Sequence, residues 1–218
     1  MKKMLVGVSL STFLIVAACG VGNEGADGDN NVNNEVENEQ NNVNDGNEAE
    51  NAADEIAEGA WETEVGETVE TEAGTFTLHA RADDIETIET GPIVMEIEQL
   101  NAQSGELSDE MVEILDTEEL HMIQLDLTVE NTADEDIMFY SGQATIATST
   151  GEQLESDMWL SDYIDGEMMA GTKANGTFFF VLENSDAADV ESVRLTWNAP
   201  LDEDWENVGE DVDIEVAF

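Results

Sequence analysis

Residues 120–130 read LHMIQLDLTVE, and this stretch decides the class of the fold. Its apolar positions are Ile123, Leu125, Leu127 and Val129, and each is followed by a polar residue. Strict alternation of this kind is typical of a β-strand with one face on a core and the other toward solvent. The stretch therefore predicts a half-buried strand.

Similar short patterns flank this strand on both sides, separated by turn residues. Only one segment, 108–115, has helical spacing, and Ser108 stands where an N-cap is expected. Strands do not alternate with helices, so a parallel sheet is excluded and an all-β antiparallel sandwich with one short helix is predicted. The other expected strands are 75–81, 92–100, 137–140, 143–149, 177–183, 193–197 and 212–218.

The order of these pieces resembles a known family. LDLTVENTADEDIMFY (125–140), QATIATSTGEQLESDMWLSD (143–162), GTKANGTFFFVL (171–182) and VRLTW (193–197) look like the immunoglobulin-like extracellular domain of Gram-positive lipoproteins. That group is labelled a domain of unknown function and is related to immunoprotective extracellular antigens. The resemblance implies an immunoglobulin-like β-sandwich on a lipid anchor, and it supplies no catalytic residue.

The first 19 residues, MKKMLVGVSLSTFLIVAAC, have the layout of a lipoprotein signal. Two lysines precede an apolar stretch that is too short to span a bilayer but fits the core of a signal peptide. The ending VAAC resembles the lipobox of bacterial lipoproteins, in which the cysteine carries diacylglycerol. We expect a signal peptide over 1–18, lipidation at Cys19, and a location on the extracellular face of a cell membrane, in a Gram-positive organism.

Residues 19–60 are rich in Asn and Glu and contain no aromatic residue, Lys or Arg. Such a composition cannot bury enough apolar surface to fold, so a disordered acidic tether is predicted. The folded domain is expected over 61–218.

The charge balance excludes one class of partner. The chain has 53 acidic and 5 basic residues and a formal net charge of −48, so nucleic acid would repel it. Two interpretations of the acidity remain open: a saline or alkaline habitat, in which charge is screened or Lys is deprotonated, and an acidic face for a cationic partner.

No motif for catalysis is found, and the sequence predicts no enzyme activity. His79 and His121 are the only imidazoles, and both fall in or beside expected strands. Neither a nucleophile elbow nor a set of metal ligands with typical spacing occurs, so no metal or cofactor is expected. The acidic run 202–207 beside Trp205 is interpreted as a solvated loop, with Ca²⁺ or sugar binding as the alternative.

The remaining candidate site is the segment 156–171, SDMWLSDYIDGEMMAG. We expect Met158, Trp159, Tyr163 and Met168 to form a binding surface, because Met and Trp make adaptable contacts and loops on a rigid sandwich often bind ligands. The alternative is that this segment closes the end of the sandwich and is core. The function predicted is a membrane-anchored binding module for a cell-envelope or protein partner. A structural or stress-related envelope protein without a specific small ligand is the alternative.

Overall fold

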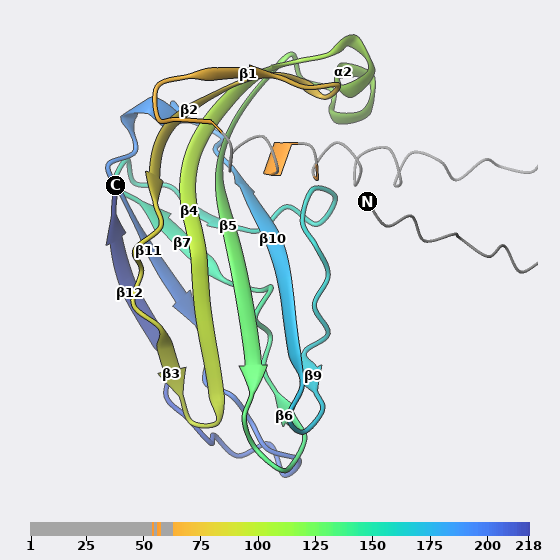
Figure 1. Ribbon diagram of the computed structural model, residues 1–218, viewed down its shortest axis with the longest axis vertical. Coiled ribbons are helices and arrows are strands. Elements are labelled where there is room, and N and C mark those ends of the chain that lie inside the picture. Colours follow the sequence, from red (N-terminus) through yellow and green to blue (C-terminus); the bar gives the residue numbers. More distant parts are fainter. Residues whose placement is uncertain (1–53, 55, 58–62) are drawn as a thin grey trace, which may run out of the picture. The chain divides into compact units, whose positions relative to one another are not determined.

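The computed structural model describes residues 54, 56, 57 and 63–218, which include two packed β-sheets (Figure 1). The larger sheet has the order β1-β2-β4-β5-β10, with β3 paired to one end of β4, and all its pairs are antiparallel. Its strands are β1 (Thr68–Glu70), β2 (Gly74–Ala82), β3 (Ile88–Thr90), β4 (Ile93–Leu107), β5 (Glu119–Asn131) and β10 (Lys173–Val181).

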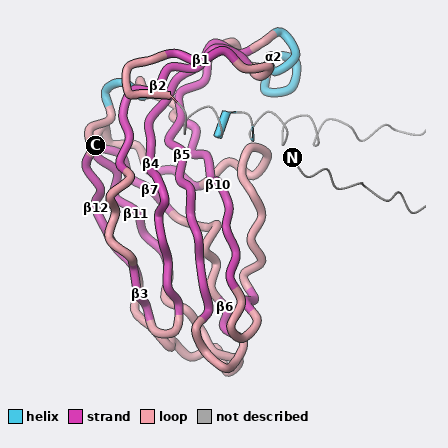
Figure 2. The backbone as a smooth tube through the Cα atoms, viewed as in Figure 1, coloured by secondary structure: helices cyan, strands magenta, loops and turns pink. Residues whose placement is uncertain are grey.

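The second sheet has the order β12-β11-β7-β8 and is also antiparallel. Its strands are β7 (Thr145–Thr148), β8 (Gln153–Glu155), β11 (Ser192–Trp197) and β12 (Val212–Ala217). A small ribbon pairs β6 (Ile137–Met138) with β9 (Glu167–Met168). The helical elements with ranges in the described chain are short, namely α2 (Asp109–Leu115) and the 3₁₀ turn η1 (Ala187–Asp189), as Figure 2 shows. The predicted all-β antiparallel sandwich with one short helix is confirmed.

The main core lies between the two sheets. From β5 it receives Ile123, Leu125, Leu127 and Val129, the apolar set that the sequence places on one face. Trp197 of β11 closes this core, and its indole Nε1 donates to the Ser141 carbonyl at 2.8 Å. This bond satisfies the one polar atom that the large ring brings into the interior.

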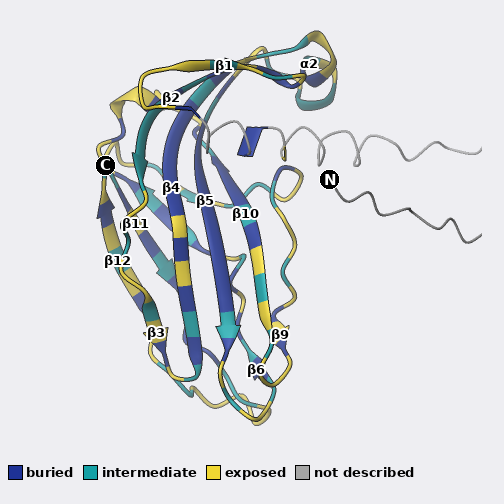
Figure 3. Ribbon diagram, viewed as in Figure 1, coloured by how far each residue is buried: buried dark blue, intermediate teal, exposed yellow. Residues whose placement is uncertain are grey.

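The opposite face of β5 corrects the sequence prediction. Gln124 and Asp126 were expected to face solvent, yet they are 0 % and 6 % exposed, and β5 is buried along most of its length (Figure 3). Burial is tolerated because these groups bond to one another: Gln103 donates to Gln124, and Gln99 and Gln124 both donate to the Asp126 carboxylate. Burial raises the pKa of Asp126 against the opposing effect of these hydrogen bonds.

A second, smaller core explains part of this burial. It contains Phe76, Met122 and Phe179, from β2, β5 and β10, together with Met111 of α2. The helix begins where the sequence predicts, because the Ser108 side chain accepts the Met111 N–H. The larger sheet thus packs apolar side chains on both faces.

Ile56 and Ala57 also belong to this second core, where they are 2 % and 8 % exposed. Both precede residue 61, where the sequence places the start of the folded domain, so buried residues extend into the range predicted for the tether. The expected signal peptide (1–18), Cys19 and most of the 19–60 range lie outside the described residues.

Candidate functional site

The loop after β8 runs along the edge of β10 and is fixed to it by main-chain hydrogen bonds. The N–H of Asp157 donates to the Phe179 carbonyl at 2.7 Å, and the N–H of Asp162 donates to the Thr177 carbonyl at 2.9 Å. These bonds hold the loop residues 156–166 against a strand of the larger sheet. The loop therefore has a defined conformation between its attachment points.

A tight turn within this loop presents large side chains outward. The Asp157 carboxylate accepts the N–H groups of Trp159 and Leu160 at 2.8 and 3.0 Å. Leu160 is 4 % exposed and packs into the second core, whereas Met158, Trp159 and Tyr163 are 84 %, 65 % and 86 % exposed. One buried residue thus anchors the turn, and three apolar or aromatic side chains remain in solvent. We call Met158, Trp159 and Tyr163 the loop surface.

A groove of about 520 Å³ lies beside the loop surface. Met158 and Tyr163 line it, and Trp159 lies on the same turn without lining it. Two carboxylates, Glu155 and Asp162, also line the groove, and none of its lining residues is Lys or Arg. The other lining residues are Gly142, Gln143, Ala144, Thr145, Ser156, Ser161, Ile164 and Asn198. A volume of this order is typical of ligand pockets, and its charge suits a neutral or cationic group.

The structure separates the four residues that the sequence predicts for this site. Three form the loop surface, but Met168 is 4 % exposed and packs in the main core, where β9 pairs it with Ile137. The expectation that Met168 faces a ligand is therefore wrong. Met168 lies in a strand, and its backbone pairing turns the side chain inward, away from solvent. The alternative interpretation, that the segment is core, holds for Leu160 and Met168, and Ile164 also packs against the main core.

Sequence reasoning missed the polar residues of the groove. Thr145 is the first residue of β7, Gln143 lies two residues before it, and Asn198 comes directly after β11. These positions are distant in the chain and carry no local motif. Only the pairing of β7 with β8 and β11 brings them together.

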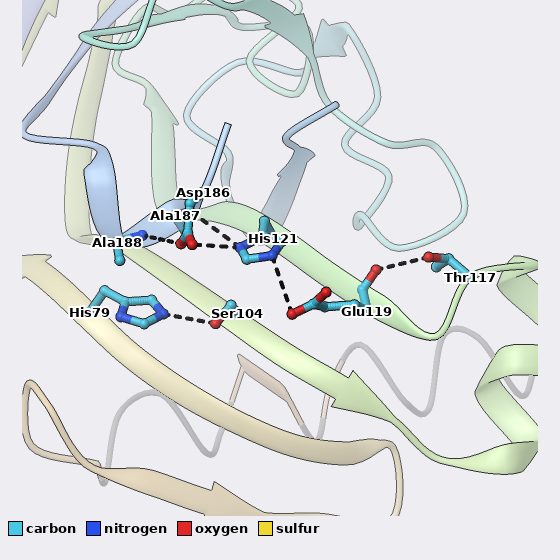
Figure 4. A network of polar contacts seen from close by, with 8 residues as sticks. All are labelled: His79, Ser104, Thr117, Glu119, His121, Asp186, Ala187 and Ala188. Atoms are coloured by element: carbon cyan, nitrogen blue, oxygen red, sulfur yellow. Dashed lines mark hydrogen bonds and ion pairs between the residues drawn. The ribbon is translucent and has the colours of Figure 1, made fainter. Parts of the chain in front are cut away.

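A network of polar contacts around the two histidines is the other cluster of chemical interest (Figure 4). His79 Nε2 lies 2.8 Å from Ser104 Oγ, a contact made where the pairing of β2 with β4 shifts register at His79. Burial lowers the pKa of His79, although Asp186 acts in the opposite direction. The sequence does not predict this pairing of a hydroxyl with an imidazole, because register shifts leave no clear mark in a sequence.

The second histidine does not complete a catalytic arrangement. The carboxylate of Asp186 lies 3.5 Å from His121 Nδ1 and that of Glu119 lies 3.7 Å from Nε2, while the Ala187 N–H donates to Nδ1 at 3.3 Å. The carboxylate thus orients His121 and not the imidazole that contacts Ser104, as Figure 4 shows. Neither histidine lines the groove beside the loop surface. The contacts of His79 link β2 to β4, and those of His121 link β5 to η1.

A metal centre is the remaining kind of site to consider. Within 63–218 and positions 54, 56 and 57, no group of three or more His, Cys, Asp or Glu side chains is placed to hold a metal ion. The acidic run near Trp205 is largely exposed, as a solvated loop would be. In the same part of the chain, no helix is long and apolar enough to cross a membrane.

Comparison with known proteins places the chain among bacterial lipoproteins. It is 30 % identical over 154 residues to the SPbeta prophage-derived uncharacterized lipoprotein YonS of Bacillus subtilis, an alignment that covers 70 % of each protein. The chain belongs to the YonS lipoprotein family. No protein-family model matches the sequence.

A solved structure resembles the sandwich of this YonS-family member. A functionally unknown protein from Listeria monocytogenes superposes with a TM-score of 0.52 at 13 % identity, covering 66 % of this chain and 88 % of that one. At this identity the likeness concerns the fold alone. Membership of the YonS family makes the chain a membrane-anchored lipoprotein.

Proposed function

We propose that this lipoprotein is attached through diacylglycerol on Cys19 and displays an immunoglobulin-like binding domain on the extracellular face of the membrane. The lipobox-like VAAC ending and membership of a lipoprotein family support the anchor. The acidic 19–60 segment acts as the spacer. A Cys19→Ala variant is expected to leave the membrane fraction, whereas retention of that variant with the membrane would contradict the anchor.

The observation that carries the binding function is the loop surface. Met158, Trp159 and Tyr163 remain exposed on a loop that hydrogen bonds hold in place, next to a groove of about 520 Å³. Clustered exposed apolar side chains on a soluble domain commonly mark an interaction site, because burying them on a partner is favourable. Because the turn is held in place, little ordering entropy is lost on binding.

The chemistry of the groove limits the chemical class of partner that we propose. Aromatic and thioether side chains next to Glu155 and Asp162 suit an apolar or cationic group of a protein or cell-envelope component. A nucleic acid partner is disfavoured by the net charge of −48. We propose binding as the role of the domain; the approach of Asp186 to His121, and not to His79, gives no support to a Ser–His–Asp triad.

Photo-crosslinking from the full-length lipoprotein in living cells tests this proposal. A photoreactive phenylalanine analogue replaces Trp159 or Tyr163, and Trp205 serves as the control because it is also 65 % exposed and lies outside the groove. We expect one shared crosslinked product from positions 159 and 163 that is absent from position 205. Equal products from all three positions, or none, would favour the alternative, a structural or stress-related envelope protein without a specific ligand.

A further inference from the structure

Strand β12 lies at one edge of the four-stranded sheet, and half of its backbone groups point away from its neighbour. The Phe218 N–H donates to the Glu191 carbonyl directly opposite. Hydrogen-bonded pairs alternate along an antiparallel ladder, so Val216 and Ile214 bond to β11, whereas Asp213, Glu215 and Ala217 direct their N–H and C=O groups outward. The Ser149 N–H donates to the Ser192 carbonyl on the β7 side of β11. Ser192 therefore does not bond to Ala217 opposite it, which agrees with this alternation.

A groove runs along this open edge. It has a volume of about 640 Å³ and lies between β12 and the segment that leads into β3, which Figure 1 shows beside β12. Ile85 and Ile88 from that segment line it together with Ile214 of β12, and all three are partly buried against the main core. No described residue hydrogen-bonds to the outward backbone groups of Asp213, Glu215 and Ala217. An added strand would find both main-chain partners and apolar contacts here.

The charges around the groove select the type of strand. Asp84, Glu86 and Glu215 line it, and no lining residue is basic. Arg194 of β11 is bound to Asp213 by two hydrogen bonds, at 2.7 and 2.5 Å, so its charge is already engaged. Opposite charges on neighbouring strands stabilise a pair, and like charges destabilise it. A second copy of this acidic edge is therefore a poor partner.

We propose that β12 binds an extended peptide segment in which basic residues alternate with apolar ones, by adding it as a fifth strand to the sheet. On the outer face the basic side chains neutralise Glu215, whereas Asp213 already pairs with Arg194. On the inner face the apolar side chains pack against Ile85, Ile88 and Ile214. This site is at the opposite edge of the sheet from the loop surface and does not depend on it.

The competing explanation is that the carboxylates only protect the edge from aggregation, a common role of charge on edge strands. The two explanations differ in how well they predict that an alternating basic peptide binds to β12. A purely protective edge binds an alternating basic peptide no better than a peptide of equal charge that cannot form an amphipathic strand. The proposed site requires the alternation.

Amide hydrogen exchange on the full mature lipoprotein in neutral detergent micelles tests the proposal. The probes are the peptide KVKVKVK, its acidic counterpart EVEVEVE, and KKKKVVV, which keeps the charge without the alternation. We expect KVKVKVK alone to slow exchange at Asp213, Glu215 and Ala217 by about tenfold or more. Unchanged exchange with KVKVKVK, or equal slowing by KKKKVVV, would overturn the proposal.

Two variants and a matched control sharpen the experiment. Ala217→Pro removes an outward N–H that makes no bond to β11, and Glu215→Lys reverses a charge that lines the groove. Glu203→Lys makes the same charge change on an exposed residue elsewhere. We expect both edge variants to lose the slowing and the control to retain it. If Ala217→Pro lowers the unfolding midpoint, loss of slowing in that variant could come from destabilisation, and the result for Glu215→Lys then tests the site. Slowing that persists in Glu215→Lys contradicts the site.

Discussion

The two edges of the four-stranded sheet differ in what they offer to a partner. At the β8 edge a pinned loop presents the side chains of Met158, Trp159 and Tyr163 beside a groove. At the β12 edge the groove is lined by carboxylates and isoleucines, and the backbone itself is available. The first edge suits recognition through side chains, and the second suits recognition through main-chain hydrogen bonds.

The difference arises from what lies along each strand in the described chain. After β8 the chain runs along β10, and this loop uses the outer main-chain groups of Thr177 and Phe179 for its own hydrogen bonds. The loop therefore presents side chains to solvent. Strand β12 is at the edge of the sheet order, and nothing in the described residues pairs with its outer side. One sandwich can therefore display two chemically distinct surfaces.

The largest expected effect is the difference in free energy of unfolding between two single variants of adjacent loop residues. Leu160→Ala should lower the free energy of unfolding by about 2–5 kcal/mol because it empties part of the second core. Trp159→Ala should change it by no more than about 0.5 kcal/mol because this side chain is exposed. Denaturant unfolding of both variants measures the difference. Equal losses would mean that Trp159 is core and that the loop surface does not exist.

Glu152 tests how the β8 edge is held in place. Its carboxylate accepts the N–H groups of Glu183 and Asn184 at 2.9 and 3.1 Å, which ties the β7–β8 turn to the end of β10. Burial raises the pKa of Glu152, but hydrogen bonds from Ser185, Glu183 and Asn184 outweigh it and hold the pKa below 4.5. Glu152→Gln should cost about 1 kcal/mol at neutral pH, because a charge-assisted acceptor is lost.

The pH dependence of the Glu152 effect is set by the direction of the shift. A lowered folded-state pKa stabilises the fold above pH 4.5, and this stabilisation is lost as the pH falls through the folded-state value. Wild type and Glu152→Gln should therefore converge in acid. A difference that stays constant from neutral to acidic pH would show that the carboxylate charge is not responsible.

A smaller effect on stability is expected at His79, which lines neither groove and serves as an internal reference. Because burial lowers its pKa below 6.5, the unfolded chain binds a proton more readily than the folded one. The contribution of neutral His79 to the free energy of unfolding should be fully present above pH 6.5 and should decrease as the pH falls below it. His79→Gln should flatten this part of the profile of unfolding free energy against pH. An unchanged slope would contradict the assignment.

Much of the fold can be predicted from the local sequence pattern, whereas the candidate sites can be predicted only in part. The alternation in β5 and the Ser108 cap of α2 are visible in the sequence because each depends on neighbouring residues. The burial of Gln124 and Asp126, the inward turn of Met168 and the contact of His79 with Ser104 depend on register and on packing between distant strands. The open edge of β12 is likewise a property of strand order, which no local pattern records.

Oxidative footprinting on intact cells tests the central claim most directly, because hydroxyl radicals label exposed Met, Trp and Tyr. Labelling of Met158, Trp159 and Tyr163 is compared between cells that carry the full-length lipoprotein and the same protein purified in detergent, with Trp205 as the internal reference. A bound partner predicts that labelling of these three residues falls several-fold on cells relative to Trp205. An unchanged ratio would show that the loop surface is free on the cell and would contradict its role as the binding site.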